Sequence, residues 1–267
     1  GKSGVFQVTA KVTGGILHYG NGWPDIENIS GDLVFRGKRM DVHARAGAIF
    51  GVRIGKVQVE IPDLQHAEKV VNVNGEAEGP TGDFFSFIEK SPVLAMEDHF
   101  TEGWQAQGNG KLSLKLSIPL YEGGKARVAG AYQFASNTVV ITPEIPALEQ
   151  AGGRIEFTDS SVRAQNLNGV LLGGPVSIAA ASARDGAARI TLQGRINPDN
   201  ARKAGGPSWI QSLRGATDWN AVINARKRNA SVVIESNLQG LAVDLPAPVV
   251  KTAAESMPLR IERRQLA

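Results

Sequence analysis

Residues 111–120 read KLSLKLSIPL and alternate strictly between polar and apolar side chains. Successive side chains of an extended strand point to opposite faces of a sheet, so the Lys and Ser residues share one face and the Leu and Ile residues share the other. Such a strand belongs to a sheet with one hydrated face and one apolar face. The apolar face needs a cover, and the cover could be a second sheet, a helix or a molecule that is not protein.

Short stretches of the same kind recur along the whole chain, separated by Gly, Asn-Gly, Gly-Lys or Pro. The links are too short for helical crossovers, which predicts an antiparallel, meander-like sheet. Only residues 83–90 and 207–215 have a helical pattern, the first with Asp83 as a candidate N-cap. Two short helices cannot cover this many half-apolar strands.

Composition excludes several classes of protein. Of 267 residues, 42% are hydrophobic and 21% are charged, which is ordinary for a folded soluble protein. No run approaches the roughly 18 apolar residues that span a bilayer. Lys and Arg exceed Asp and Glu by only 29 − 26 = 3, with the signs interspersed, so we expect no nucleic-acid partner. Because the chain starts at Gly1 inside a strand pattern, we expect a piece of a longer protein whose signal or anchor lies outside it.

The chain also repeats itself at an offset of 146 − 24 = 122 residues. The matched positions are Pro24 and Pro146, Ile26 and Leu148, Gly31 and Gly153, Leu33 and Ile155, Phe35 and Phe157, Gly47 and Gly169, and Gly51 and Gly173. A repeat of this length predicts an array in which neighbouring units continue one sheet. We expect a first β unit at 1–120, a second at 121–230, and final strands at 231–267 that begin a further unit. The alternative is two similar sandwich domains side by side.

The sequence contains no pattern that indicates catalysis. His18, His43, His66 and His99 are dispersed, and there is no cysteine to form a disulfide or a thiolate metal site. There is no Gly-x-Ser-x-Gly motif, and the Gly-Lys pairs at 37/38, 55/56, 110/111 and 124/125 lack the flanking residues of a phosphate loop. We therefore predict a protein that is not an enzyme, with no catalytic residue, no metal and no cofactor.

Several segments resemble the YhdP family, which are large AsmA-like proteins of Gram-negative envelopes. The resemblance rests on LHYGNGWPDIENISGDLVFRGKRMDVHARAGAIFGVRIGKVQVEIPDL from Leu17, on FFSFIEKSPV and GNGKLSLKLSIPL, and on SNLQGLAVDLPAPVVK from Ser236. It implies an inner-membrane anchor outside this piece and a long periplasmic body. That body would be an elongated, curled β-sheet with an open apolar groove along which phospholipid passes toward the outer membrane.

The residue pattern and the resemblance together predict a lipid-transport function. An uncovered apolar face could close by packing sheet on sheet, or it could stay open as a groove for acyl chains. For the open groove we expect phospholipid acyl chains as ligands, with other envelope proteins as further candidate partners. The alternative is a non-catalytic scaffold whose edge strand pairs with an envelope protein. The predicted groove lining is Leu33, Phe35, Ile54, Val57, Val59, Ile61, Leu112, Leu114, Leu116, Ile118, Ile190, Leu192 and Ile196.

Overall fold

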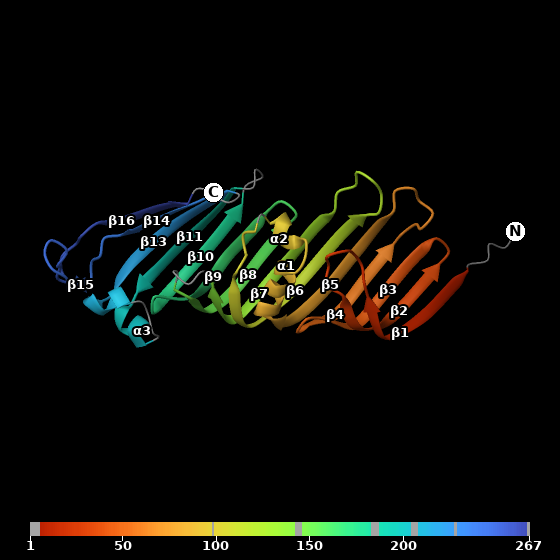
Figure 1. Ribbon diagram of the computed structural model, residues 1–267, viewed down its shortest axis with the longest axis horizontal. Helices are drawn as coiled ribbons and strands as arrows, with labels where there is room; N and C mark the ends of the chain where they lie inside the picture. The colour runs from red at the N-terminus through yellow and green to blue at the C-terminus, as the bar shows by residue number, and fades with distance from the viewer. Residues whose placement is uncertain are drawn as a thin grey trace. The chain divides into compact units, whose positions relative to one another are not determined.

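The computed structural model describes residues 6–97, 99–141, 146–182, 187–203, 208–226 and 229–265. Fourteen of its strands form one sheet in the order β1-β2-β3-β4-β5-β6-β7-β8-β9-β10-β11-β13-β14-β16 (Figure 1). Strands β12 and β15 form a separate two-stranded sheet. Nearly every strand therefore pairs with the strand next to it in the sequence, as short links require. The predicted mainly-β fold, with a large antiparallel sheet and a few short helices, is confirmed.

The strands have these bounds: β1 (Gln7–Leu17), β2 (Ile26–Arg36), β3 (Arg39–Ile49), β4 (Val52–Ile61), β5 (Val70–Pro80), β6 (Gln105–Pro119), β7 (Arg127–Val140), β8 (Leu148–Thr158), β9 (Val162–Leu171), β10 (Gly174–Ser182), β11 (Ala187–Ile196), β12 (Leu213–Gly215), β13 (Thr217–Arg226), β14 (Asn229–Ser236), β15 (Leu241–Val243) and β16 (Leu259–Gln265).

The chain forms two compact units. Unit 1 comprises Gly1–Met96, Asn109–Gln133 and Glu156–Ser160, and unit 2 comprises Glu97–Gly108, Phe134–Ile155 and Ser161–Ala267. The domain boundaries expected from the sequence, after residues 120 and 230, follow the repeat rather than these units. They remain a prediction.

The helices match the sequence in part. α1 (Thr81–Glu89) confirms the first predicted helix, but its N-cap is Pro80 with no side-chain cap, and Asp83 lies inside the first turn. Of the second predicted helix, residues 208–212 form a 3₁₀ helix, η1 (Ser208–Ser212), and the following residues form β12; residue 207 lies outside the described residues. α2 (Val93–Met96) and α3 (Pro198–Lys203) were not predicted.

The repeat seen in the sequence reappears in the backbone. A shift of 122 residues converts the bounds of β2 into those of β8, and it brings β3 and β4 within one residue of β9 and β10. The unusual backbone angles repeat as well. Asn28 and Gln150 have φ values of 55° and 52°, and Phe50 and Leu172 have values of 52° and 54°. Positive φ is uncommon outside glycine, so two such pairs at one offset indicate the same local chain path in both copies.

In unit 1, aromatic contacts fix α1 against the strands. The hydroxyl groups of Thr81 and Tyr132 lie 2.8 Å apart. The ring of Phe84 meets that of Tyr132 edge to face, with centroids 5.0 Å apart. On another side, Phe87 contacts Trp23 of the β1–β2 loop at 6.0 Å between centroids. The edge-to-face pair of Phe84 and Tyr132 stabilises beyond its area burial. Together with the tilted contact of Phe87 and Trp23, it positions α1 between the β1–β2 loop and β7.

In unit 2, a small closed core lies where β11 ends and β13 begins. Its buried members are Ile196, Ala201, Ile210 and Leu241, with Leu172, Leu213, Trp219 and Leu238 packed against them. The guanidinium group of Arg202 in α3 donates to the carbonyl oxygens of Ile210 at 3.0 Å and Leu213 at 2.8 Å. These bonds satisfy backbone acceptors in a segment with little regular structure. We call the assembly of α3, η1, β12 and β15 the unit 2 cap.

Candidate functional site

The strand register of unit 1 gathers apolar side chains on one face of its sheet. Cross-strand partners point to the same face, and residues two apart along a strand do so too. One row across β2 to β6 contains Leu33, Val42, Val59, Val73 and Leu116. The rows beside it contain Phe35, Met40 and Ile61, and Ala44, Val57, Gly75 and Leu114. We call this the apolar face of unit 1.

All ten residues of unit 1 that the sequence predicts as groove lining lie on this face. Ile54 is the instructive case, because it is an odd number of residues away from Val57. A shift of register between Ile54 and Val57 changes the alternation there. Ile54 therefore pairs with Ala77, which pairs with Leu112, on the same face as the others.

The apolar face of unit 1 lacks a closed core. Among the described residues of unit 1, the buried hydrophobic side chains are Val52, Ile61 and Ala131. The other nine predicted lining residues of this unit are only half-buried. Within the part of unit 1 that the structure describes, no second sheet packs on this face, since the two-stranded sheet belongs to unit 2.

In unit 2, the three predicted residues also share one face, but their surroundings differ. Ile190 pairs with Ile223, Leu192 with Ala221 and Ile196 with Thr217. Ile190 and Leu192 are half-buried. Ile196 is 7% exposed, because it belongs to the closed core beneath the unit 2 cap.

Two buried polar atoms lie at this capped end of unit 2. The hydroxyl oxygen of Thr217 and the indole nitrogen of Trp219 are buried and have no hydrogen-bond partner among the described residues. Both side chains are on the face of β13 that carries Ala221 and Ile223. A buried donor or acceptor without a partner lowers the stability of the fold. The Thr217 hydroxyl and the Trp219 indole therefore destabilise the capped end of unit 2.

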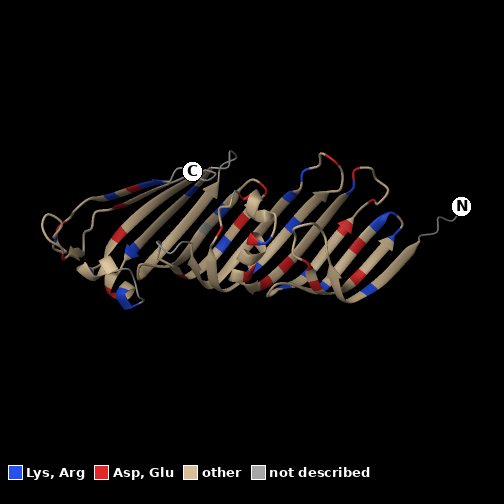
Figure 2. Cartoon of the chain, viewed as in Figure 1, with Lys and Arg blue, Asp and Glu red and all other residues tan. Residues whose placement is uncertain are grey.

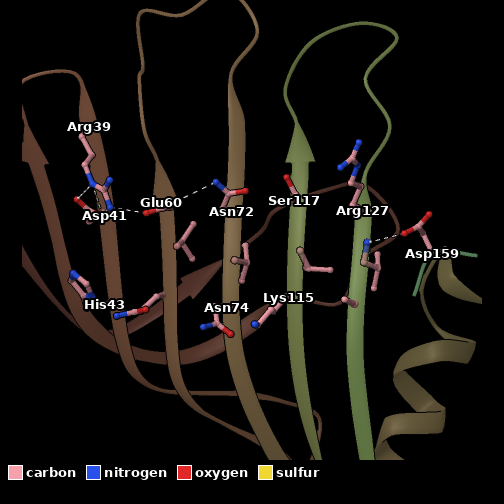
Figure 3. Close-up of a pocket in the computed structure, with 16 residues that line it drawn as sticks. Arg39, Asp41, His43, Glu60, Asn72, Asn74, Lys115, Ser117, Arg127 and Asp159 are labelled. Atoms are coloured by element: carbon pink, nitrogen blue, oxygen red, sulfur yellow. Dashed lines mark hydrogen bonds and ion pairs between the residues drawn. The ribbon is translucent and has the colours of Figure 1, made fainter. Parts of the chain in front are cut away.

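The opposite, hydrated face of unit 1 carries a polar groove of about 690 Å³ (Figure 3). The charges on the strands have both signs and do not separate into one basic and one acidic patch (Figure 2). One row of the groove contains Asp41, Glu60, Asn72 and Ser117, and the next contains His43, Gln58, Asn74 and Lys115. Arg39, Arg127 and Asp159 complete its polar lining.

One end of the polar groove is an ion-pair network. The guanidinium group of Arg39 contacts Asp41 at 2.7 Å and Glu60 at 2.6 Å, and the amide of Asn72 donates to Glu60 at 3.4 Å (Figure 3). The hydrogen bond from Arg39 lowers the pKa of the Asp41 carboxyl group, because it favours the charged form. In return, the carboxylate of Asp41 raises the pKa of Arg39.

The other end of the groove carries exposed cations. Lys115 and Arg127 form no ion pair with any described residue, and both are exposed. Asp159 accepts a long hydrogen bond of 3.5 Å from the backbone nitrogen of Val128. Arg39 is therefore paired with carboxylates, whereas the exposed side chains of Lys115 and Arg127 are hydrated by solvent.

The sequence matches the model of the YhdP protein family over residues 1–266. The chain belongs to the YhdP family. The match confirms the resemblance carried by the Gly-Trp-Pro turn and the alternating strands. No curated protein and no solved structure matches the chain significantly. The YhdP match covers both units and therefore all of the strands. It does not indicate which face of the sheet is functional.

Two further observations on this YhdP-family chain concern metal binding and membrane spans. Among the described residues, no cluster of three or more His, Cys, Asp or Glu side chains could hold a metal ion. No helix within the described ranges is long and apolar enough to cross a membrane.

The polar groove was not predicted. The sequence predicts an apolar groove, whereas the groove on unit 1 combines charged groups, amides and a hydroxyl with Val59, Val73, Leu116, Val128 and Ala129. The polar side chains of this groove alternate with the apolar ones on the same strands. The sequence therefore contained a sign of a polar face, in residues such as Gln58 and Asn74. A one-strand pattern cannot show that four strands place these groups together. The lipid-binding role of the apolar face stays a prediction.

Proposed function

We propose that this chain is a segment of a periplasmic lipid-transport bridge, along which phospholipid moves between the inner and outer membranes. The acyl chains lie on the apolar faces of the two units. One observation carries the proposal: nine predicted lining residues of unit 1 share a face and stay half-buried, with only three buried hydrophobic side chains in the described part of the unit. A large uncovered apolar surface marks a binding surface.

The energetics favour an occupant of lipid type. Apolar surface gains about 25 cal/mol for each Å² removed from water, so an uncovered sheet face is costly when it is empty. Each acyl methylene group that the face shields is worth roughly 0.8 kcal/mol. Rows of Leu, Val and Ile offer no fixed hydrogen-bonding partner, and a chain can therefore slide along them.

The remaining roles follow from the same proposal. The chain is non-catalytic, since its face supplies contact surface and no reacting group. The full-length protein is anchored in the inner membrane by a segment outside residues 1–267, and this piece lies in the periplasm. Family membership supports that placement.

Exposed apolar side chains on β1 favour a second candidate, a protein-interaction scaffold. β1 exposes Ile16 at 71% and Leu17 at 47%. Apolar side chains that water reaches in this way can contact another envelope protein.

Native mass spectrometry of the chain purified from a Gram-negative periplasm separates the two functions. Lipid transport predicts co-purified phospholipid that chloroform–methanol extraction removes and added phospholipid vesicles restore. If the chain carries no lipid and takes none up from vesicles, the apolar face is not a lipid site and the scaffold function gains.

A further inference from the structure

α1 covers one set of strand ends in unit 1. A Cβ atom at Gly51, in the β3–β4 turn, would meet the carboxylate of Asp83 in α1. Phe87 of the same helix contacts Trp23 in the β1–β2 loop, with ring centroids 6.0 Å apart. Figure 1 shows α1 lying across the sheet. We call these covered strand ends, at the β1–β2 loop, the β3–β4 turn and the end of β5, the helix margin.

The helix lies on the apolar side of the sheet. Gly110 is on the same face of β6 as Leu112 and Leu114, because alternate residues of a strand share a face. The Tyr132 ring that contacts α1 occupies the position where a Cβ atom of Gly110 would be. Val52, at this end of the same face, is 5% exposed, whereas Leu114 is half-buried. α1 therefore closes the apolar face at the helix margin.

Unit 2 closes the equivalent strand ends of its own sheet. Gly173, which the offset of 122 residues matches with Gly51, lies in the β9–β10 turn. A Cβ atom there would meet the backbone of Asn197 and Ala201 at α3. Ile196, at the end of β11, is buried beneath the unit 2 cap. Closure of the apolar face at these strand ends is thus a feature of the repeat.

The opposite strand ends of unit 1 carry loops and no helix. They are residues 37–38, 62–69 and 120–126, all of which the structure describes, and we call them the loop margin. Ile61 is buried near them, but Phe35 and Met40 in the same row are half-buried.

The charges of the two margins also differ. The three loops of the loop margin hold equal numbers of Lys and of Asp and Glu, 3 − 3 = 0. Residues 18–25 and 81–96 at the helix margin hold three acidic residues and one Lys, a net negative charge of 3 − 1 = 2. A hydrated group that carries phosphate is therefore favoured at the loop margin, where water reaches it and no net negative charge repels it.

The distance between the two margins fits one acyl chain. Leu112 and Ile118 share a face of β6 and are six residues apart, so they are separated by about 20 Å at about 3.3 Å per residue. A bilayer core of about 30 Å holds two layers of acyl chains, so one chain spans about 15 Å. An acyl chain parallel to the strands fits between the margins.

We propose that a phospholipid on unit 1 lies parallel to the strands, with the ends of its acyl chains at the helix margin and its headgroup at the loop margin. This orientation rests on the proposed lipid-transport function. It also shows how the lipid can move. A lipid that passes sideways from strand to strand keeps its headgroup in water along one margin, so the polar group is never desolvated.

Fluorescence quenching at single cysteine positions tests this orientation, because the chain has no native cysteine. Bimane is attached in Leu112→Cys, near the helix margin, and in Ile118→Cys, near the loop margin. Each labelled chain is loaded from vesicles of phosphatidylcholine that carries a nitroxide either at the end of one acyl chain or on the headgroup. The chain is then separated from the vesicles.

The two labels should respond in opposite ways, because they are about 20 Å apart. We expect the nitroxide at the acyl end to quench position 112 more than position 118, by about twofold or more, since quenching needs close approach over that distance. The headgroup nitroxide should quench position 118 more. Ala77→Cys and Val71→Cys, which face Leu112 and Ile118 from β5, repeat the comparison. Circular dichroism melts check that each variant is folded.

Two results would overturn the orientation and leave lipid transport intact. Equal quenching of both positions by both lipids would show that the acyl chains have no fixed direction along the strands. Stronger quenching of position 112 by the headgroup nitroxide would place the headgroup at α1. No quenching at any of the four positions would show that the chain binds no phospholipid, and the proposed function would then fail as well.

Discussion

The hydroxyl groups of Thr81 at the start of α1 and Tyr132 in β7 lie 2.8 Å apart and join the helix to the sheet. Thr81 is only 1% exposed, so this contact is shielded from water, and burial raises the pKa of the Tyr132 phenol. The ring reaches Thr81 by crossing over Gly110, where a Cβ atom would overlap it. The absence of a side chain at Gly110 therefore allows α1 to dock.

We predict that Gly110→Ala lowers the free energy of unfolding by about 2 kcal/mol, because the added methyl group displaces the Tyr132 ring. Gly55→Ala is the matched control. A Cβ atom there would make only an ordinary contact, 3.5 Å from the carbonyl oxygen of Glu76. Urea unfolding of both variants measures the difference. Equal midpoints would show that the ring is not constrained by Gly110.

Thr217→Val is expected to raise the free energy of unfolding by about 1 kcal/mol, since it replaces an unpaired buried hydroxyl with a methyl group. Thr191→Val serves as the comparison, because its hydroxyl donates to the carbonyl of Ala179 at 3.4 Å and should gain nothing. Thermal melts measured side by side give the answer. A destabilised Thr217→Val variant would indicate that a bound water or ligand satisfies that hydroxyl.

The Arg39–Asp41 contact predicts a pH dependence. The pKa of Asp41 is lowered from its ordinary value of 3.8 by the hydrogen bond from Arg39. Folding is thus favoured above that value, and this contribution is lost as the pH falls through the lower, folded pKa. In Arg39→Gln the carboxyl pKa, followed by carbon-detected NMR titration, should return toward 3.8. An unchanged titration midpoint would contradict the assigned cause.

Leu114→Glu should leave a folded protein that retains little or no phospholipid. On a half-open face the carboxylate can turn to water, so the fold survives while the apolar row is interrupted. Lys115→Glu places the same charge on the neighbouring position of the hydrated face and should keep its lipid. Circular dichroism melts report folding, and lipid extraction reports retention. If Leu114→Glu unfolds, the face is an ordinary closed core, where a buried unpaired charge is not tolerated.

Much of the fold could be predicted because alternation is a local property. The alternation of residues 111–118 shows which side chains share a face without reference to any other strand. The offset of 122 residues gives the position of β8 once β2 is known. α3 was missed because its signal is short. The side chain of Asn197 accepts a hydrogen bond from the backbone nitrogen of Asn200 at 3.1 Å, and Pro198 begins the helix. Asn followed by Pro is a typical helix start. The helix has only six residues, too few to show a helical pattern of apolar side chains.

The sites were less predictable, because they depend on register. Ile54 lies on the apolar face only through the shift before Val57, and no single-strand pattern shows it. Ile196 has the parity of a lining residue, but the unit 2 cap buries it. The polar groove contains Asp41, Glu60 and Lys115 from three separate strands. The strand register brings them to one groove, and the register cannot be deduced from the pattern of a single strand.

Site-specific photo-crosslinking at two adjacent positions tests the central claim most directly. Benzoylphenylalanine at residue 114 would lie on the apolar face and at residue 115 on the hydrated face. With the chain in the periplasm and illuminated in cells, the account predicts phospholipid adducts at position 114 and none at position 115. Equal labelling of both positions, or no phospholipid adduct at position 114, would contradict it.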